Sequence, residues 1–189
     1  LGNLIIFIVL ITILEGGSSF YFAYQGVRDE IKKKLFLAER LHTEYDSLLG
    51  WVNKPNISID NMYGPNMHLK INGQRFRNNN DFTIRVPKGK IRVICSGDSF
   101  TLGYGVDNSQ TWCKLLQLID PRIESINMGQ GGYGIGQAYL WYKRDGTLLD
   151  HNIHIFAFIS ADFTRMMQKD FMGVPKPLLR SRNGKFFVE

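Results

Sequence analysis

The hydrophobic pattern begins with a long apolar segment. Residues 1–14 carry no charged side chain, and apolar residues continue past Glu15 and a Gly–Ser run to Phe20–Tyr24. At about 1.5 Å per residue, a helix over residues 1–26 would cross a hydrocarbon core about 30 Å thick. Glu15 costs roughly 2.5–3.5 kcal/mol on insertion scales, which its apolar neighbours offset. We therefore predict a transmembrane or signal-anchor helix over residues 1–26; a signal peptide and a buried soluble helix are the alternatives.

The next sixty residues are more polar and contain shorter apolar runs. Residues 27–49 are polar and predict a juxtamembrane helix. Proline, asparagine and glycine are dense from residue 50 to 88, where the short alternating runs 68–71 and 82–86 predict β-structure. The interval 27–88 is therefore expected to form a juxtamembrane helix and a small β-rich lead-in that ends in a turn at Pro87–Lys90.

From Ile91 onward, short apolar runs alternate with helical patterns. Strands are expected at 91–95, 123–128 and 153–159, and helices at 112–119 and 136–149. This alternation predicts an α/β domain over residues 89–189 with a parallel sheet and helices on its faces. In such sheets, ligands bind beyond the carboxyl ends of the strands. Ser99, Gly132 and Asp162 all fall at those ends.

Composition excludes several classes of function. Apolar residues make up 44% of the 189 residues, which is enough for a packed core. The net charge of +6 is dispersed, its densest cluster being Lys32–Lys34, and this favours a juxtamembrane anchor over nucleic-acid binding. Cys95 and Cys113, the two cysteines, lie in apolar surroundings and are expected to be buried residues rather than metal ligands.

Ser99 is the candidate nucleophile. A serine becomes nucleophilic when a rigid turn holds it beside a base and beside donors for an oxyanion. Residues 96–106, Ser-Gly-Asp-Ser-Phe-Thr-Leu-Gly-Tyr-Gly-Val, resemble the first block of SGNH/GDSL-type serine hydrolases. Residues 127–134, Asn-Met-Gly-Gln-Gly-Gly-Tyr-Gly, are similar to the second block, whose glycine maps to Gly132. The segments 49–51 and 73–77 look like the lead-in of membrane-associated members, so the resemblance covers roughly residues 48 to 165.

The resemblance implies a flavodoxin-like three-layer α/β/α domain and a catalytic arrangement. Ser99 would be the nucleophile, and the backbone N–H groups of Ser99 and Gly132 would bind the oxyanion. Gly97, Asp98, Asn127 and Ser160 would support the site, with Asp98 accepting backbone N–H bonds within the turn. The implied mechanism needs no cofactor and no metal.

The sequence departs from the family pattern in two places. Ala161 stands where the third block has an oxyanion-binding asparagine, and losing one such donor typically costs on the order of 10²–10³ in rate; Ser160 could substitute for it. The family's Asp-x-x-His has no match, so we expect the catalytic histidine and its aspartate beyond Glu189. His42 and His68 are expected at the surface. His151 and His154 are expected to be solvent-facing residues at the start of a strand.

The predicted function is that of an esterase or acyl-transfer enzyme acting on an ester-bearing substrate, such as an acylated glycan or lipid, at a membrane. The positive-inside rule would place the domain in the cytoplasm, whereas the resemblance favours a single-pass protein with an extracytoplasmic catalytic part.

Two other functions stay open. One is a membrane-tethered binding module that uses Asn127 and Tyr133 for recognition. The other is a dinucleotide-binding domain, since Gly129, Gly131 and Gly134 match Gly-x-Gly-x-x-Gly and Asp162 ends the next strand.

Overall fold

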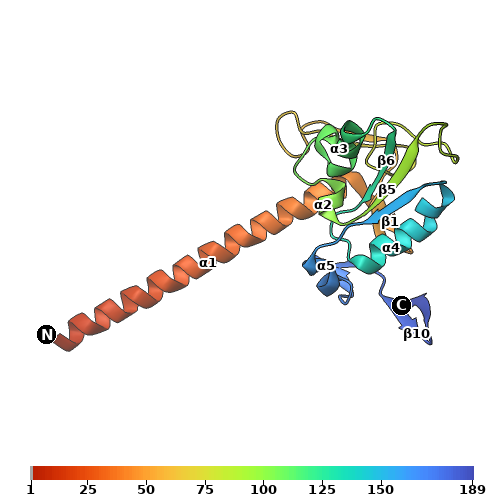
Figure 1. Cartoon of the computed structure of the whole chain (residues 1–189). Coiled ribbons are helices and arrows are strands. Elements are labelled where there is room, and N and C mark those ends of the chain that lie inside the picture. Colours follow the sequence, from red (N-terminus) through yellow and green to blue (C-terminus); the bar gives the residue numbers. More distant parts are fainter. Residues whose placement is uncertain (1) are drawn as a thin grey trace. The chain divides into compact units, whose positions relative to one another are not determined.

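The computed structural model describes residues 2–189, without the side chains of residues 2–4, 8 and 32–40 (Figure 1). The chain divides into two units, Leu1–Leu41 and His42–Glu189. The first unit belongs to one helix, and the second contains the strands and the remaining helices.

Helix α1 (Gly2–His42) runs without interruption. Its segment Ile5–Ile31 is long and apolar enough to cross a membrane, although a signal sequence near an N-terminus would have the same properties. Large apolar side chains of this segment, such as Phe20 at 76% and Leu14 at 72%, are exposed. The predicted membrane and juxtamembrane helices are therefore one continuous helix, with no break near residue 26. The helix expected up to residue 49 ends at His42, because the residues that follow pair as strand β1 (Thr43–Asp46).

Two antiparallel hairpins form the lead-in. Strands β1 (Thr43–Asp46) and β2 (Gly50–Asn53) pair with each other, as do β3 (Ile57–Ile59) and β4 (Leu69–Ile71). β4 matches the strand predicted at 68–71. The Pro87–Lys90 turn also forms, closed by a 3.0 Å hydrogen bond from the Lys90 N–H to the Pro87 carbonyl.

The strand expected at 82–86 is absent from the structure. The carboxamide of Gln74 accepts from the Phe82 N–H at 2.7 Å and donates to the Phe82 carbonyl at 2.9 Å. The carbonyls of Thr83 and Ile84 accept from the Arg92 guanidinium at 2.7 and 3.0 Å. Side chains thus satisfy backbone groups that a strand partner would otherwise pair.

The central sheet has three parallel strands, β5 (Ile91–Gly97), β6 (Ile123–Gly129) and β7 (Ile153–Phe156), in the order β6-β5-β7. All three strands begin where the apolar runs predicted them, and their parallel pairing is confirmed. β7 ends at Phe156, three residues before the predicted end at 159. β5 is the middle strand and pairs along its full length with β6, up to Gly97 opposite Gly129.

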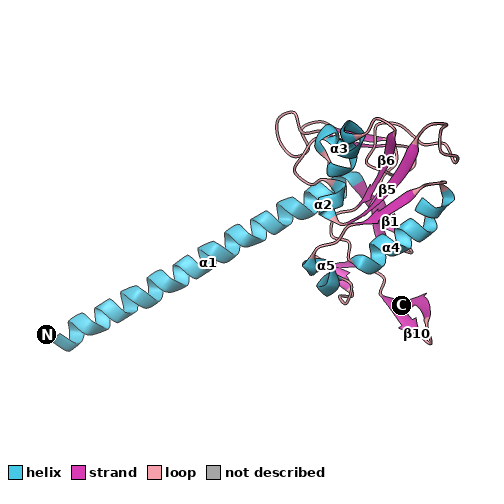
Figure 2. Ribbon diagram, in the orientation of Figure 1, coloured by secondary structure: helices cyan, strands magenta, loops and turns pink. Residues whose placement is uncertain are grey.

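Helices pack on both faces of this sheet (Figure 2). Helix α3 (Trp112–Ile119) follows a short 3-10 helix, η1 (Asn108–Gln110), and its Cys113 packs with Val93 and Cys95 of β5. Helix α4 (Ile135–Arg144) packs Ala138 and Trp141 against Ile94 on the opposite face. α3 has its predicted bounds.

The helix expected over 136–149 ends early. α4 stops at Arg144, and a separate 3-10 helix, η2 (Gly146–Leu148), follows it. Asp145 stands at the break, where its carboxylate accepts from the Trp141 indole N–H at 2.8 Å. Gly146 packs under the ring of Tyr142, where a Cβ would lie 2.6 Å from Tyr142 Cδ2.

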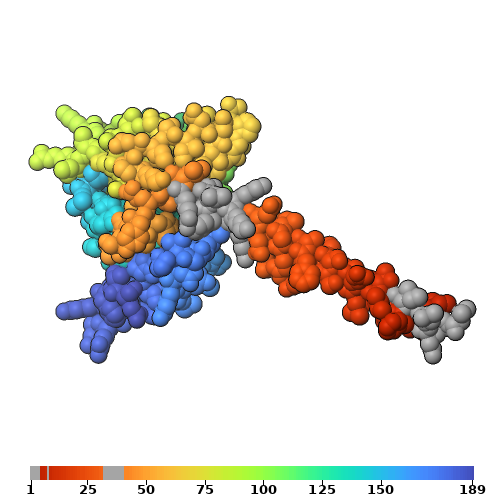
Figure 3. Space-filling view, turned by 180° about the vertical axis from the view of Figure 1, so that it is seen from behind, coloured from red at the N-terminus to blue at the C-terminus, as the bar shows by residue number. Residues whose placement is uncertain are grey.

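The remaining elements are short. Helix α2 (Ser99–Leu102) follows β5, and helix α5 (Ser160–Arg165) follows β7. Two hairpins end the chain: β8 (Asp170–Phe171) with β9 (Val174–Pro175), and β10 (Leu179–Arg182) with β11 (Lys185–Val188). Within this unit, Figure 3 shows the lead-in, coloured orange to yellow, and the chain end, coloured blue, both reaching the surface.

Candidate functional site

Ser99 is the first residue of α2, immediately beyond the carboxyl end of β5. Its side chain is partly exposed, and its hydroxyl forms no hydrogen bond within residues 2–189. The last residue of β5 before this turn has to be glycine. A Cβ on Gly97 would lie 2.3 Å from both the Ala157 carbonyl oxygen and Thr101 Oγ1. The tight packing explains why the strand can turn directly into a helix and present a serine at the edge of the sheet.

Asp98 holds the turn rather than serving as a free acid or base. Its carboxylate is buried, and Oδ1 accepts from the Phe100 N–H at 2.9 Å as the N-cap of α2. The second oxygen, Oδ2, accepts from Arg165 Nη1 at 3.2 Å. The backbone bond expected from the sequence is present, and the arginine adds an ion pair that the sequence did not indicate.

Arg165 also binds Asp162, so one guanidinium bridges two buried carboxylates. The distance from Arg165 Nη1 to Asp162 Oδ1 is 2.7 Å. Burial raises the pKa of Asp162 above its usual value, and the nearby Asp98 charge adds to this effect while Arg165 opposes it. Asp162 further accepts from the Ile159 N–H at 3.0 Å and thereby fixes the start of α5. This residue is therefore committed to structure.

The glycine loop after β6 lies at the same edge of the sheet as Ser99. The Gln130 N–H donates to the Gly97 carbonyl at 3.1 Å, which continues the β5–β6 pairing to the last residue before Asp98. At Gly129, a Cβ would lie 1.9 Å from the Leu102 nitrogen, so the backbones of β6 and α2 are in direct contact. Two loops that approach this closely can contribute backbone donors to one site.

Gly132 adopts a conformation that favours glycine, with φ of +74°. The ring of Phe171 from β8 covers it, and a Cβ on Gly132 would lie 2.4 Å from Phe171 Cε1. In the part of the chain that the structure describes, neither the Gly132 N–H nor the Ser99 N–H is used in a hydrogen bond. Within these residues, neither N–H is committed to a partner, and Gly132 itself is buried under Phe171.

Asn127 has a structural function. Its side chain is buried, accepting from the Gly129 N–H at 2.9 Å and donating to the Leu102 carbonyl at 3.4 Å. Tyr133 is also fully buried, with its hydroxyl donating to the Trp51 carbonyl at 2.5 Å. The expectation that Asn127 and Tyr133 are recognition groups is therefore wrong for Tyr133, which an aromatic cluster encloses, while the Asn127 carboxamide is bonded within the protein.

Ser160 begins α5 and is exposed, while the neighbouring Ala161 is half-buried. In the third block of the family, an asparagine side chain donates to the oxyanion. The methyl group of Ala161 cannot donate, and no hydrogen bond within the described part of the protein directs the Ser160 hydroxyl toward this position. Substitution by Ser160 therefore stays a prediction.

The histidines differ from the sequence expectation. His42 is buried rather than at the surface, whereas His68 is half exposed and lies 3.3 Å from Asp60. His154 Nε2 lies 2.6 Å from Ser96 Oγ, and its ring stacks on Tyr142. The expectation of a solvent-facing His154 is wrong because the residue points onto the face of the sheet that α4 covers.

His151 is likewise held by the protein. Its Nδ1 lies 2.8 Å from the Leu149 carbonyl, and its Nε2 lies 2.9 Å from the Tyr142 hydroxyl. A carbonyl only accepts, so His151 Nδ1 donates to Leu149. The described residues contain no group of three or more side chains suited to a metal ion.

The glycine loop that resembles a dinucleotide-binding motif has no space for a pyrophosphate. A Cβ at Gly134 would lie 2.7 Å from the Met166 nitrogen, and Phe171 covers Gly132. The Gly131 carbonyl accepts from the Trp51 indole at 2.9 Å. The glycines thus allow protein segments to pack on the loop, where a pyrophosphate would require open space.

Phe171, Trp51 and Lys176 border the glycine loop and were not predicted as site residues. Trp51 stacks on Phe171 with ring centroids 5.9 Å apart. Lys176 is buried, with Nζ 3.3 Å from Gln137 Oε1, and burial lowers its pKa to about 8, assisted by the Arg165 charge. The Gly-Val-Pro-Lys sequence at 173–176 contains no pattern that predicts a buried lysine next to the glycine loop.

Comparison with known proteins assigns no family. The chain matches no protein-family model, and a search of curated proteins also finds no match.

Proposed function

We propose that residues 42–189 belong to a serine hydrolase or acyl-transfer enzyme that acts on ester bonds through Ser99. The observation that carries this proposal is the placement of the Ser99 hydroxyl. It stands unbonded and partly exposed at the end of β5, beside a glycine loop whose Gly132 N–H is also unbonded. The proposal includes completion of the three-stranded sheet as a flavodoxin-like α/β/α domain.

In the proposed reaction, Ser99 Oγ attacks the carbonyl carbon of an ester and transfers its proton to a histidine. The Ser99 and Gly132 N–H groups stabilise the negative charge on the former carbonyl oxygen. Collapse of this intermediate breaks the bond to the alcohol, which receives the proton, and leaves an acyl group on Ser99. Water or a sugar hydroxyl then takes the acyl group.

We propose a histidine as the base, and neither His151 nor His154 is placed for this function. His151 and His154 are held on the α4 face of the sheet by Tyr142 and Ser96. Asp98 and Asp162 are both bound to Arg165, which makes them poor partners for such a base. A histidine arriving from elsewhere in the protein would complete the site.

The apolar α1 supports a membrane location, and we propose a single-pass protein whose α/β domain is extracytoplasmic. A substrate near a membrane surface, such as an acylated glycan or lipid, is consistent with this location. The mechanism calls for no cofactor and no metal, and no nucleic-acid partner is proposed.

A non-catalytic, membrane-tethered binding module is the second candidate. Ala161 in place of an asparagine donor favours it, as does the absence of any described histidine contact with Ser99. Turnover of p-nitrophenyl acetate by protein from the complete coding sequence separates the two. Loss of turnover in Ser99→Ala with unchanged thermal unfolding supports catalysis, and equal turnover in the variant removes Ser99 from the mechanism.

A further inference from the structure

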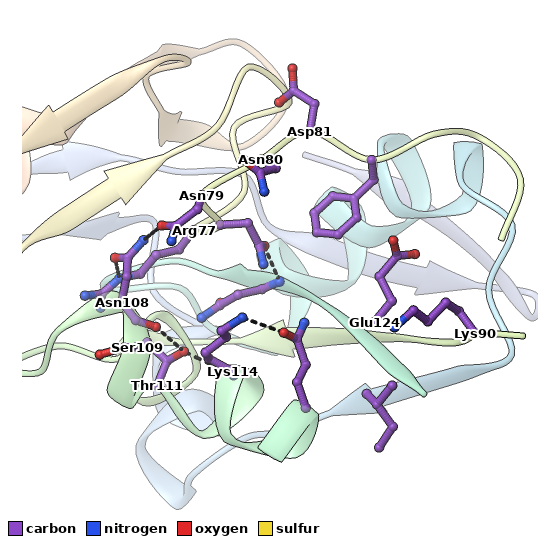
Figure 4. Close-up of a pocket in the computed structure, with 15 residues that line it drawn as sticks. Arg77, Asn79, Asn80, Asp81, Lys90, Asn108, Ser109, Thr111, Lys114 and Glu124 are labelled. Atoms are coloured by element: carbon purple, nitrogen blue, oxygen red, sulfur yellow. Dashed lines mark hydrogen bonds between the residues drawn. The ribbon is translucent and has the colours of Figure 1, made fainter. Parts of the chain in front are cut away.

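A cavity of about 380 Å³ lies along the outer edge of β6, away from the α4 face (Figure 4). Three segments enclose it: the loop 77–82, the segment from η1 into α3, and the residues Ile123 and Glu124 of β6. In Figure 4, Asn79 and Asn80 approach from one side, and Ser109, Thr111 and Lys114 from the other. None of these residues was singled out by the sequence.

Carboxamides and hydroxyls are the most numerous side-chain groups that line the cavity. They outnumber the apolar pair Phe82 and Ile123, while polar and apolar atoms contribute nearly equal shares of the lining surface, as a sugar ring with its hydroxyls and apolar face would require. The lining residues with neutral polar side chains are Asn78, Asn79, Asn80, Asn108, Asn127, Ser109, Thr111 and Gln117.

The deepest amides are fixed by bonds to the protein. Asn108 Oδ1 accepts from the Lys70 N–H at 3.1 Å and from Arg77 Nε at 2.7 Å. Asn78 donates to the Ser125 carbonyl at 3.0 Å and accepts from the Asn127 N–H at 2.9 Å. These walls are held in place before any ligand arrives, which reduces the entropy cost of binding.

One of the three cations around the cavity, Arg77, has all of its donors engaged, and the two lysines are engaged only in part. The Arg77 guanidinium makes five hydrogen bonds to protein oxygens, at 2.5 to 3.1 Å. Lys114 Nζ donates to Gln117 Oε1 at 2.6 Å, and Lys90 Nζ donates to the Pro121 carbonyl at 2.8 Å. Arg77 therefore has no free N–H for an anion, whereas each lysine ammonium keeps further N–H donors, so phosphate competition tests whether an anion binds here.

Negative charge is engaged as well. Glu124 Oε2 accepts from Arg92 Nε at 2.6 Å, and Asp81 accepts from the Gly73 N–H at 2.7 Å. Asp81 also points away from the other labelled side chains (Figure 4). Asn80 lies at the exposed rim of the cavity, and its carboxamide has no hydrogen-bond partner among the described residues, so both its donor and its acceptor are open to a ligand or to solvent.

We propose that this cavity binds a neutral, polyhydroxylated ligand, one or two rings of a saccharide. Each hydroxyl both donates and accepts, and a carboxamide offers the complementary pair. The volume equals that of about a dozen water molecules at about 30 Å³ each, which suits one or two sugar rings. This site is separate from Ser99 and does not depend on the proposed catalytic function.

The test is isothermal titration of the full chain, held in lipid nanodiscs free of sugar detergent, with a panel of uncharged disaccharides that includes maltose, cellobiose and N,N′-diacetylchitobiose. Asn80→Ala removes the free amide and should weaken binding about 2- to 10-fold, the value of one hydrogen bond. Asn80→Trp fills the cavity and should abolish binding. Asn66→Ala changes an exposed loop asparagine outside the cavity and serves as the matched control.

We expect at least one saccharide to bind to the natural protein and to Asn66→Ala, but not to Asn80→Trp. Inorganic phosphate should not compete for the site. Affinity should hold from low to high salt, because the ligand carries no charge. Absence of binding across the panel would overturn the proposal, as would phosphate competition or equal affinity in Asn80→Trp. These binding measurements do not depend on ester turnover. If Ser99→Ala showed that Ser99 is not catalytic, the saccharide proposal would still stand or fall on binding alone.

Discussion

Arg165 Nη1 lies 3.2 Å from Asp98 Oδ2 and 2.7 Å from Asp162 Oδ1, so the helix after β7 is tied to the residue that precedes Ser99. Both carboxylates are 2% exposed, and the arginine is 22% exposed. The ion pair spans 67 residues of sequence and joins the ends of β5 and β7. The Ser99 turn therefore depends on a segment distant in the chain.

Replacement of Arg165 by methionine should destabilise the domain by about 3 kcal/mol, because two buried carboxylates would lose their common cation. Urea unfolding measures the change. The loss should shrink toward acidic pH, since protonation of Asp162, whose pKa is raised by burial, removes one of the uncompensated charges. Arg180→Met, which breaks the exposed pair with Glu189, is the control and should change stability little. Equal effects of the two substitutions would contradict the bridging function of Arg165.

Lys176 should make stability depend on pH. Its folded pKa is lowered from 10.5 to about 8 by burial, with a contribution from Arg165 that Asp170 opposes. The unfolded chain therefore binds more protons between these values, and stability rises as pH increases through that interval. Lys176→Met should be more stable than the natural protein at pH 7, by up to about 3 kcal/mol. The difference in stability should vanish above the pKa of the lysine in the unfolded chain. A difference that does not vary with pH would show that burial does not destabilise the charged ammonium of Lys176.

Gly132→Ala should cost about 2–4 kcal/mol, from a left-handed backbone and a collision with Phe171. Gly173→Ala isolates the backbone contribution, because its φ is +78° and nothing lies within 4 Å of an added Cβ. A Gly132→Ala, Phe171→Leu double variant should recover part of the loss. Thermal unfolding of the natural protein, Gly132→Ala, Phe171→Leu and the double variant gives the coupling energy, and strict additivity would mean that Phe171 does not confine Gly132.

Arg77 should be important for the position of α2. It donates to the Leu102 carbonyl at 2.8 Å and to the Gly103 carbonyl at 2.5 Å, at the end of the helix that begins with Ser99. Arg77→Met leaves these carbonyls unpaired and should destabilise by about 3 kcal/mol or more. Arg77→Lys should recover only part of this, since an ammonium cannot reproduce the five-bond fork. Full recovery by lysine in urea unfolding would contradict this geometry.

Much of the fold follows from local patterns. The strands, the helix Trp112–Ile119 and the Pro87 turn are each determined by apolar periodicity or by turn residues within a short window. The failures are non-local. The segment 82–86 alternates like a strand, but Gln74 and Arg92 bind its backbone through side chains. Periodicity contains no information about such partners.

The candidate site was predictable only in part. The positions of Ser99 and Gly132 at strand ends follow from the alternation of strands and helices. The ion pair of Asp98 with Arg165 and the cover that Phe171 places on Gly132 arise from segments that approach each other only in the folded chain. His154 was expected to face solvent because it lies at the start of a strand, whereas α4 provides Tyr142 as a stacking partner.

The most direct measurement is fluorophosphonate labelling, with the modified residue mapped by mass spectrometry. It uses the protein from its complete coding sequence, compared with Ser99→Ala and with Ser96→Ala as the matched control. Ser96 belongs to the same Ser-Gly-Asp-Ser run and contacts a histidine at 2.6 Å, yet it is fully buried. We expect the label on Ser99, its loss in Ser99→Ala and its retention in Ser96→Ala. Labelling of Ser96, or none at Ser99, would contradict the assignment of Ser99 as the nucleophile.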